Sequence, residues 1–183
     1  MYDEILPGLG HVRLVPVDPA AHAALLHGFV TQRHTAFWGM SEYTLDEVRE
    51  VYEFLDSLTT HHAYLVQLDD RPIGILQTYE PAVDPVGECY PAQAGDIGMH
   101  VLLAPGRRPP RGLIAALGPV FGRFLFTDPG KDRIVVEPDI RNAAALRRLE
   151  RQGFTFGDEI DLPGKRARLA FISRSHFESI HPA

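Results

Sequence analysis

Two helices are predicted in the first third of the chain. Apolar residues over 45–58 recur at intervals of three or four, which places them on one face of a helix. The sequence Thr44-Leu45-Asp46-Glu47, where this stripe begins, has the form of a capping box. An earlier helix, over about residues 19–30, follows Asp18-Pro19, which suit the N-cap and the first helical position. The polar and aromatic segment 34–40 between the two helices is predicted as a loop.

Short runs of alternating or continuous apolar residues predict the strands. Two of these runs flank Asp69-Asp70-Arg71, a turn sequence that favours a hairpin. Residues 81–95 are predicted as a long loop. The predicted strands cover residues 11–15, 63–68, 72–79, 97–103, 133–137, 154–161 and 166–172.

Two more helices are predicted in the second half of the chain. Residues 113–126 have helical spacing, although Pro119 inside the apolar stripe is expected to kink the helix. Residues 142–152 are rich in Ala, Leu and Arg, and Gly153 suits the position just after a helix. The strand, helix and strand over 97–137 form a parallel βαβ crossover, so the predicted fold class is α/β with a mixed central sheet.

The composition is that of an ordinary globular chain, with 45% hydrophobic and 23% charged residues. Its 183 residues predict a single domain, 1–183. A formal net charge of −6 excludes a basic nucleic-acid footprint over the whole surface. No apolar run is long enough to span a bilayer, the N-terminus is acidic where a signal peptide would be basic, and Cys89 is the only cysteine. We therefore expect a soluble cytoplasmic protein with no nucleic-acid or membrane partner.

A basic, proline-rich loop joins the predicted strand 97–103 to the helix 113–126. Its arginines Arg107, Arg108 and Arg111 precede a helix N-terminus, where unpaired peptide N–H groups and the helix dipole favour an anion. Arginine adds bidentate contacts to phosphate, so a diphosphate is the expected ligand. A merely solvated basic loop is the alternative interpretation.

Three short motifs follow one another from this loop: Arg107-x-x-Pro110-x-Gly112, Asn142-x-x-Ala145 and Gly153-Phe154. Together they resemble the GCN5-related N-acetyltransferase (GNAT) superfamily. The resemblance implies a GNAT fold with the crossover at the acyl-CoA site, and acetyl-CoA or succinyl-CoA as co-substrate. No metal is expected, because His61-His62 has no Asp, Glu or Cys partner at metal-ligand spacing. Two positions depart from the family pattern. Pro110 replaces a glycine and removes one N–H, and Leu149 stands where many members carry a tyrosine that protonates the departing thiolate.

Five further motifs are spread over almost the whole chain. They are Phe37-Trp38-x-Met40, Tyr79-x-Pro81-x-x-Asp84, Gly95-Asp96-Ile97-Gly98-Met99-His100, Val136-Glu137-Pro138-Asp139-x-Arg141-Asn142 and Leu162-Pro163-x-Lys165-x-Ala167. This set is similar to that of the siderophore-biosynthetic acyltransferases of aerobactin, mycobactin and desferrioxamine type. The resemblance implies an acyl-CoA-dependent N-acyltransferase that converts an N-hydroxylated amine, such as N-hydroxylysine or N-hydroxycadaverine, to a hydroxamate.

The resemblance also implies a catalytic pair, His100 and Asp139. His100 lies in an apolar strand near Gly98, which indicates a close backbone approach. Asp139 follows the next parallel strand, so both side chains can flank one cleft. We expect Asp139 to act as general base and His100 to hold the acceptor hydroxyl, with the reverse assignment left open. A satisfied core histidine is the alternative interpretation of His100.

Further residues are expected to bind the two substrates. The backbone of Val101, Leu102 and Leu103 would pair with the pantetheine arm, and an N–H of Val101 or Leu102 would meet the oxyanion. Gly112 and the three arginines would hold the phosphates, and Asn142 would either reach the arm or cap a helix. The expected acceptor-binding residues are Trp38, Met40, Tyr79, Asp84, Asp96, Glu137 and Lys165.

Other interpretations of the same residues stay open. Trp38 and Met40 suit core packing as well as an acceptor wall, and Lys165 suits a turn. The sequence Leu125-Phe126-Thr127-Asp128-Pro129 is shared with aminoglycoside 6′-N-acetyltransferases, so an aminoglycoside or a polyamine is the second substrate class. A CoA-binding module without turnover is a third hypothesis. The acyl chain, and the choice between a monomer and a homodimer, are not decided by the sequence.

Overall fold

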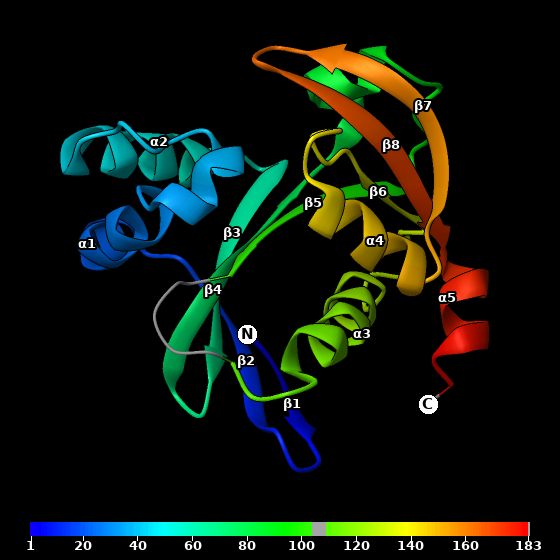
Figure 1. The fold of residues 1–183 in the computed structure, drawn as a ribbon, viewed down its shortest axis with the longest axis horizontal. Coiled ribbons are helices and arrows are strands. Elements are labelled where there is room, and N and C mark those ends of the chain that lie inside the picture. The colour runs from blue at the N-terminus through cyan, green and yellow to red at the C-terminus, as the bar shows by residue number, and fades with distance from the viewer. Residues whose placement is uncertain (104–108, 183) are drawn as a thin grey trace. The chain divides into compact units, whose positions relative to one another are not determined.

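The computed structural model describes residues 1–103 and 109–182 (Figure 1). The strands are β1 (Tyr2–Leu6), β2 (Gly10–Pro16), β3 (His61–Leu68), β4 (Arg71–Tyr79), β5 (Asp96–Leu103), β6 (Arg133–Val136), β7 (Thr155–Leu162) and β8 (Lys165–Ser173). The α-helices are α1 (Pro19–Val30), α2 (Leu45–Ser57), α3 (Leu113–Leu125), α4 (Ala143–Arg151) and α5 (Arg174–Ile180). Short 3-10 helices are η1 (Arg33–Trp38), η2 (Pro81–Val83) and η3 (Pro85–Glu88).

The strands form a mixed sheet in the order β1-β2-β3-β4-β5-β6-β8-β7. β5 and β6 pair in parallel, with Asp96 opposite Arg133 and Gly98 opposite Val135, and α3 lies between them in the chain. The β1–β2, β2–β3, β6–β8 and β7–β8 pairs are antiparallel. The predicted α/β fold with a parallel crossover is therefore confirmed.

The chain divides into two compact units, and the first comprises Met1–Thr78 and His100–Arg111. In this unit α1 packs against α2, and both bury apolar side chains in one core with β3, β4 and the end of β5. α2 begins with the predicted capping box: the backbone N–H of Thr44 donates to the Glu47 carboxylate at 2.7 Å, and the backbone N–H of Glu47 donates to the Thr44 hydroxyl at 3.3 Å. The core residues of this unit include Leu26, Val48, Tyr52, Leu65, Ile75 and Leu102.

The second unit comprises Tyr79–Met99 and Gly112–Ala183. Its core is formed by one face of β6 and of the long β7–β8 hairpin, together with the segment that follows β4. The buried members of this cluster are Tyr79, Val86, Val135, Ile160, Ala167 and Leu169.

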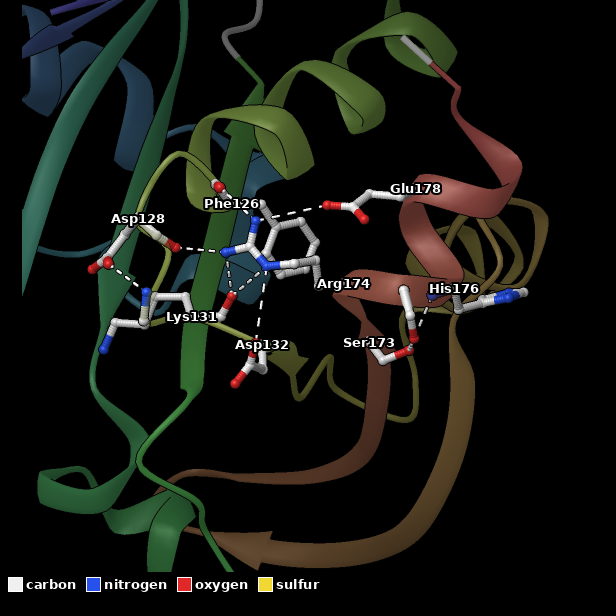
Figure 2. Close-up of polar contacts among 10 residues, drawn as sticks. Phe126, Asp128, Lys131, Asp132, Ser173, Arg174, His176 and Glu178 are labelled. Atoms are coloured by element: carbon white, nitrogen blue, oxygen red, sulfur yellow. Dashed lines mark hydrogen bonds and ion pairs between the residues drawn. The ribbon is translucent and has the colours of Figure 1, made fainter.

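Arg174, the first residue of α5, ties this helix to the loop before β6 (Figure 2). Its guanidinium donates hydrogen bonds of 2.5–3.0 Å to the carbonyl oxygens of Phe126, Asp128 and Lys131. It also lies over the Phe126 ring, 4.8 Å from the ring centre. Phe126 is the C-cap of α3, and Asp128 and Lys131 lie in the loop that follows it. The arginine therefore holds the connection between α3 and β6 in place.

The strand β1 and the helix α5 were not predicted from the sequence. No strand was predicted before His11, yet β1 forms because its backbone pairs with β2. The short helix α5 was also missed, although Ser173 caps it by accepting from the N–H of His176. α3 runs from Leu113 to Leu125 with Pro119 inside it, so the predicted helix is observed, and the kink expected at Pro119 stays a prediction. Every helix in the described part of the chain is too short or too polar to span a bilayer.

Candidate active site

His100 lies half-buried on β5 in the first unit and contacts Trp38. The imidazole and indole centroids are 6.4 Å apart, with the planes at 78°, so the rings meet edge to face. Trp38 ends η1, and Gly39 behind it has a φ of +84°, a conformation that favours glycine. Trp38 and Met40 also pack on the core of the first unit. The fold thus places Trp38, which is predicted to line the acceptor site, against His100, which is predicted to be catalytic. Packing against the core helps to position Trp38 and Met40.

Tyr52 is a site candidate that the sequence indicated only as a core residue of α2. Its side chain is buried, and within the described residues its phenol oxygen has no hydrogen-bond partner. Burial raises the pKa of Tyr52, while the nearby side chains of Trp38 and Gln77 act in the opposite direction. The helical periodicity of α2 predicted that Tyr52 is buried. Its polar neighbours Trp38 and Gln77 come from η1 and β4, so no local sequence pattern indicated these contacts.

The end of β5 carries the backbone groups expected to meet the CoA arm. Leu102 is buried, while Val101 and Leu103 are half-buried. Gly74 on β4 permits a close approach here, because a Cβ at this glycine would lie 2.4 Å from the carbonyl oxygen of Leu102. Arg107 and Arg108 lie outside the described residues, so their phosphate contacts stay a prediction.

Gly112 stands at the N-cap of α3 with a φ of +90°. This left-handed conformation favours glycine, and a glycine supplies no side-chain acceptor to the first N–H groups of the helix. The neighbouring Arg111 is exposed. The local geometry agrees with an anion-binding helix start, and the anion itself stays a prediction.

Asp139 is buried in the second unit, where Arg141 holds its carboxylate. The Arg141 guanidinium donates to both carboxylate oxygens, at 2.9 and 2.6 Å, and the Arg141 backbone N–H donates to one of them at 2.8 Å. These hydrogen bonds lower the pKa of Asp139 to about 2 against the opposing effect of burial, and the charge of Lys165 adds to the lowering. A carboxylate with this pKa is a weak base near neutral pH. Arg141 stands in one of the sequence motifs but was given no role there.

Tyr79, Glu137 and Lys165, all expected to bind the acceptor, contact one another. The Tyr79 hydroxyl donates to one Glu137 carboxylate oxygen at 2.5 Å, and the Lys165 ammonium donates to the other at 3.1 Å. The Glu137 side chain is only 3% exposed. Burial raises the pKa of Tyr79, and the charge and hydrogen bond of Glu137 raise it further. The three residues therefore form a polar network around the buried Glu137 carboxylate, inside the second unit.

The buried Asp96 carboxylate is the centre of a second hydrogen-bonded network. Arg133 donates to both of its carboxylate oxygens at 2.7 and 2.8 Å, and the Tyr90 hydroxyl and the Gln93 backbone N–H add bonds of 2.8 and 2.9 Å. Burial alone raises the pKa of Asp96, but the hydrogen bonds led by Arg133 lower it overall. The carboxylate is completely buried. These contacts favour a structural role for Asp96 over the expected acceptor contact.

Asp84 and Asn142 both serve as helix caps. Asp84 accepts from the backbone N–H of Val86 at the start of η3, at 3.0 Å. Asn142 accepts from the backbone N–H of Ala145 at the start of α4, at 3.1 Å. The capping role weighed for Asn142 is observed, and its contact with CoA stays a prediction. So does the pairing of His100 with Asp139, because the two residues belong to different units.

Residues 18–162 match the family model described as "Acetyltransferase (GNAT) domain". Among solved structures, the aminoglycoside acetyltransferase AAC(6')-Ib in complex with coenzyme A has a TM-score of 0.82 and 26% identity, over 93% of this chain and 99% of that chain. An uncharacterised protein from Bacillus halodurans, with a TM-score of 0.89 and 21% identity over 97% of this chain and 92% of that one, shows the same fold.

Two relatives extend the comparison to acetyltransferases named for N-hydroxylated amines. The N(6)-hydroxylysine O-acetyltransferase of Escherichia coli is 34% identical over 125 residues, which are 66% of this chain and 39% of that protein. The N-hydroxyputrescine acetyltransferase of Acinetobacter baumannii is 32% identical over 78 residues, 43% of this chain and 37% of that protein. The matched part thus spans about two fifths of these relatives. On the family match, the chain belongs to the GNAT acetyltransferases.

Proposed function

We propose that this chain transfers an acyl group from acyl-CoA to the nitrogen of an N-hydroxylated amine, giving a hydroxamate of the kind used in siderophore biosynthesis. The observation that carries the proposal is the 34% identity over 125 residues to the protein named N(6)-hydroxylysine O-acetyltransferase, whose name gives the N-hydroxylated amine as its substrate. The N-hydroxyputrescine acetyltransferase among the relatives supports the same substrate class. The family match supports acyl-CoA as the donor. A cytoplasmic location, where acyl-CoA is made and used, fits this reaction.

In the proposed reaction, the hydroxylamine nitrogen attacks the thioester carbonyl carbon. A C–N bond forms, the carbonyl oxygen takes up negative charge, and the nitrogen loses its proton to a base. Collapse of the adduct breaks the C–S bond and releases CoA as a thiolate, which takes up a proton. Leu149, buried on α4, stands where many members of the family carry a tyrosine acid, so solvent or another group supplies this last proton.

We assign the base to His100 and the fixed negative charge to Asp139. This reverses the first expectation, because Arg141 keeps Asp139 ionised and weakly basic, with a pKa of about 2. An imidazole has the reference pKa suited to proton transfer near neutral pH, about 6.5. The edge-to-face contact with Trp38 contributes to the orientation of the His100 ring. Trp38 and Met40 would then wall the alkyl chain of the acceptor.

The CoA moiety would lie along the end of β5 and at the start of α3. Backbone groups of Val101 to Leu103 would pair with the pantetheine arm, and one of their N–H groups would meet the oxyanion. The N-terminus of α3 after Gly112, with Arg107, Arg108 and Arg111, would hold the diphosphate. Asn142 already uses its carbonyl oxygen as a cap, which leaves its amide NH₂ as the group for the arm.

An aminoglycoside acetyltransferase is the second candidate function. It is favoured by the TM-score of 0.82 to AAC(6')-Ib over 93% of this chain. A substrate panel separates the two: N-hydroxylysine, N-hydroxycadaverine, lysine and kanamycin, each with acetyl-CoA and with succinyl-CoA. The hydroxamate product is read as its ferric complex and CoA release is read in parallel. Acylation of kanamycin at a kcat/KM above that of both hydroxylamines would replace the proposed function by the second one.

A further inference from the structure

Lys165 is placed to support the backbone around Glu137. It begins β8, and its ammonium group donates to the Glu137 carbonyl oxygen at 2.8 Å as well as to the Glu137 carboxylate. Its side chain is 27% exposed, so part of the ammonium is withdrawn from water by these two contacts. A buried carboxylate such as Glu137 needs a cation of this kind, because an uncompensated buried charge is strongly unfavourable.

The residues after Glu137 are held to β8 by backbone hydrogen bonds. The carbonyl oxygen of Pro138 accepts from the backbone N–H of Arg168 at 2.9 Å, and the backbone N–H of Ile140 donates to the carbonyl oxygen of Arg166 at 3.0 Å. Asp139 lies between these two bonds, opposite Ala167. The position of the Asp139 carboxylate therefore depends on how this short segment is seated against the first residues of β8.

Tyr79 holds the Glu137 carboxylate from β4, on the side that Lys165 does not contact. Its ring lies directly on Gly98 of β5, where a Cβ would come within 2.1–2.5 Å of the ring atoms. Only a glycine leaves room for the ring at this point. The hydroxyl of Tyr79 then reaches Glu137 at the end of β6. Glu137 is thus fixed from β4 and β8 at once.

We propose that Lys165 is a positioning residue for Asp139, which acts through Glu137 and the segment 137–140 and not through contact with substrate. The inference rests on the proposed function for its catalytic consequence. This positioning role replaces the expectation that Lys165 binds the acceptor. Both of its observed contacts go to Glu137, and the same residue carries the backbone that leads to Asp139.

Two acceptors distinguish positioning from substrate contact, since N-hydroxylysine has a carboxylate and N-hydroxycadaverine has none. We expect Lys165→Met to lower kcat by about 10-fold or more for both acceptors, with the KM for acyl-CoA and the KM ratio of the two acceptors unchanged. A rise in KM confined to N-hydroxylysine would overturn the inference. The double variant with Glu137→Gln should lose clearly less than the product of the two single losses, because both changes remove the contact between the ammonium and the Glu137 carboxylate; losses that multiply would also overturn it.

Arg174→Met is the matched control. Arg174 is another partly buried cation of the second unit, 23% exposed, that donates to backbone carbonyls. It should lower the melting temperature as Lys165→Met does, with kcat within about twofold of the wild type. A kcat loss in Arg174→Met equal to that in Lys165→Met would mean that lost stability explains both, and the positioning role would be wrong.

Amide hydrogen exchange separates this inference from the proposed function. In Lys165→Met, the exchange of the Ile140 and Arg168 amides should be at least 10-fold faster than in the wild type, and in Arg174→Met it should not. Unchanged exchange at both amides in Lys165→Met would overturn the inference. If the wild type acylates neither hydroxylamine while this exchange pattern holds, the proposed function fails and the support of Asp139 by Lys165 stands.

Discussion

The Arg141 guanidinium donates hydrogen bonds to both oxygens of the Asp139 carboxylate. The arginine side chain is 71% exposed, whereas the aspartate side chain is only 5% exposed. An exposed cation thus keeps a buried carboxylate ionised. The backbone N–H of Arg141 donates to the same carboxylate, so all of these contacts form between residues only two positions apart in the chain. This arrangement suits a fixed negative charge better than a proton acceptor.

Acid should destabilise the protein in part through Asp139. Its folded pKa, about 2, lies below the unfolded reference near ~3.9, so the ionised group stabilises the fold above about pH 4 and loses this effect as the pH falls toward 2. Arg141→Met should lower the urea midpoint at pH 7. It should also make the decline of this midpoint between pH 5 and pH 2 shallower than in the wild type. The exposed Arg147→Met is the control and should leave the decline as in the wild type. Equal declines in Arg141→Met and the wild type would contradict the prediction.

His100→Gln should lower kcat for N-hydroxylysine by about 10²–10⁴, the usual contribution of a positioned acid or base. Asp139→Asn should also lower kcat, and the KM for acyl-CoA should change little in both, because neither side chain is assigned to CoA. His62→Gln, an exposed histidine on β3, is the control with unchanged kinetics. Turnover close to wild type in both His100→Gln and Asp139→Asn would remove these two residues from the mechanism.

Gly112→Ala should weaken acyl-CoA binding through the start of α3. An alanine at φ +90° is strained by about 1–2 kcal/mol, although a Cβ there would meet no atom within 4 Å. Gly8→Ala, at φ +74° and equally open, is a matched control for the strain alone. Both variants should lose similar stability in urea, but only Gly112→Ala should raise the KM for acyl-CoA. An equal KM in the two variants would argue against an anion at this helix start.

The enzyme should prefer N-hydroxycadaverine to cadaverine by more than a hundredfold in kcat/KM at pH 7. An alkylamine with a reference pKa near ~10.4 is almost entirely protonated there, while the N-hydroxyl group lowers the basicity and frees the lone pair. From pH 7 to 8 the unprotonated alkylamine increases about tenfold, so the preference should narrow by about that factor. Similar rates for both acceptors at pH 7 would favour a general polyamine acetyltransferase.

Local patterns in the sequence were sufficient for the elements whose signals lie within a few residues. The capping box at Thr44 and Glu47 formed as predicted, and so did the cap at Asp18, whose carboxylate accepts from two backbone N–H groups of α1. The crossover from β5 through α3 to β6 was also predicted, since its apolar strands and helical stripe are each continuous in the chain. The short elements β1 and α5 were missed, because they are stabilised by pairing and docking more than by their own periodicity.

The identity of the candidate site residues followed from the sequence, but their roles depended on tertiary contacts. Asp96 and Glu137 look like acceptor ligands in the sequence, yet Arg133 lies 37 positions and Lys165 28 positions away in the chain from the carboxylates that they neutralise. A buried carboxylate takes its role from whichever cation the fold places beside it, because desolvation makes an unpaired charge too costly. The sequence alone therefore determined the fold class and supplied the candidate site residues, and only the folded chain decided which charged groups support one another.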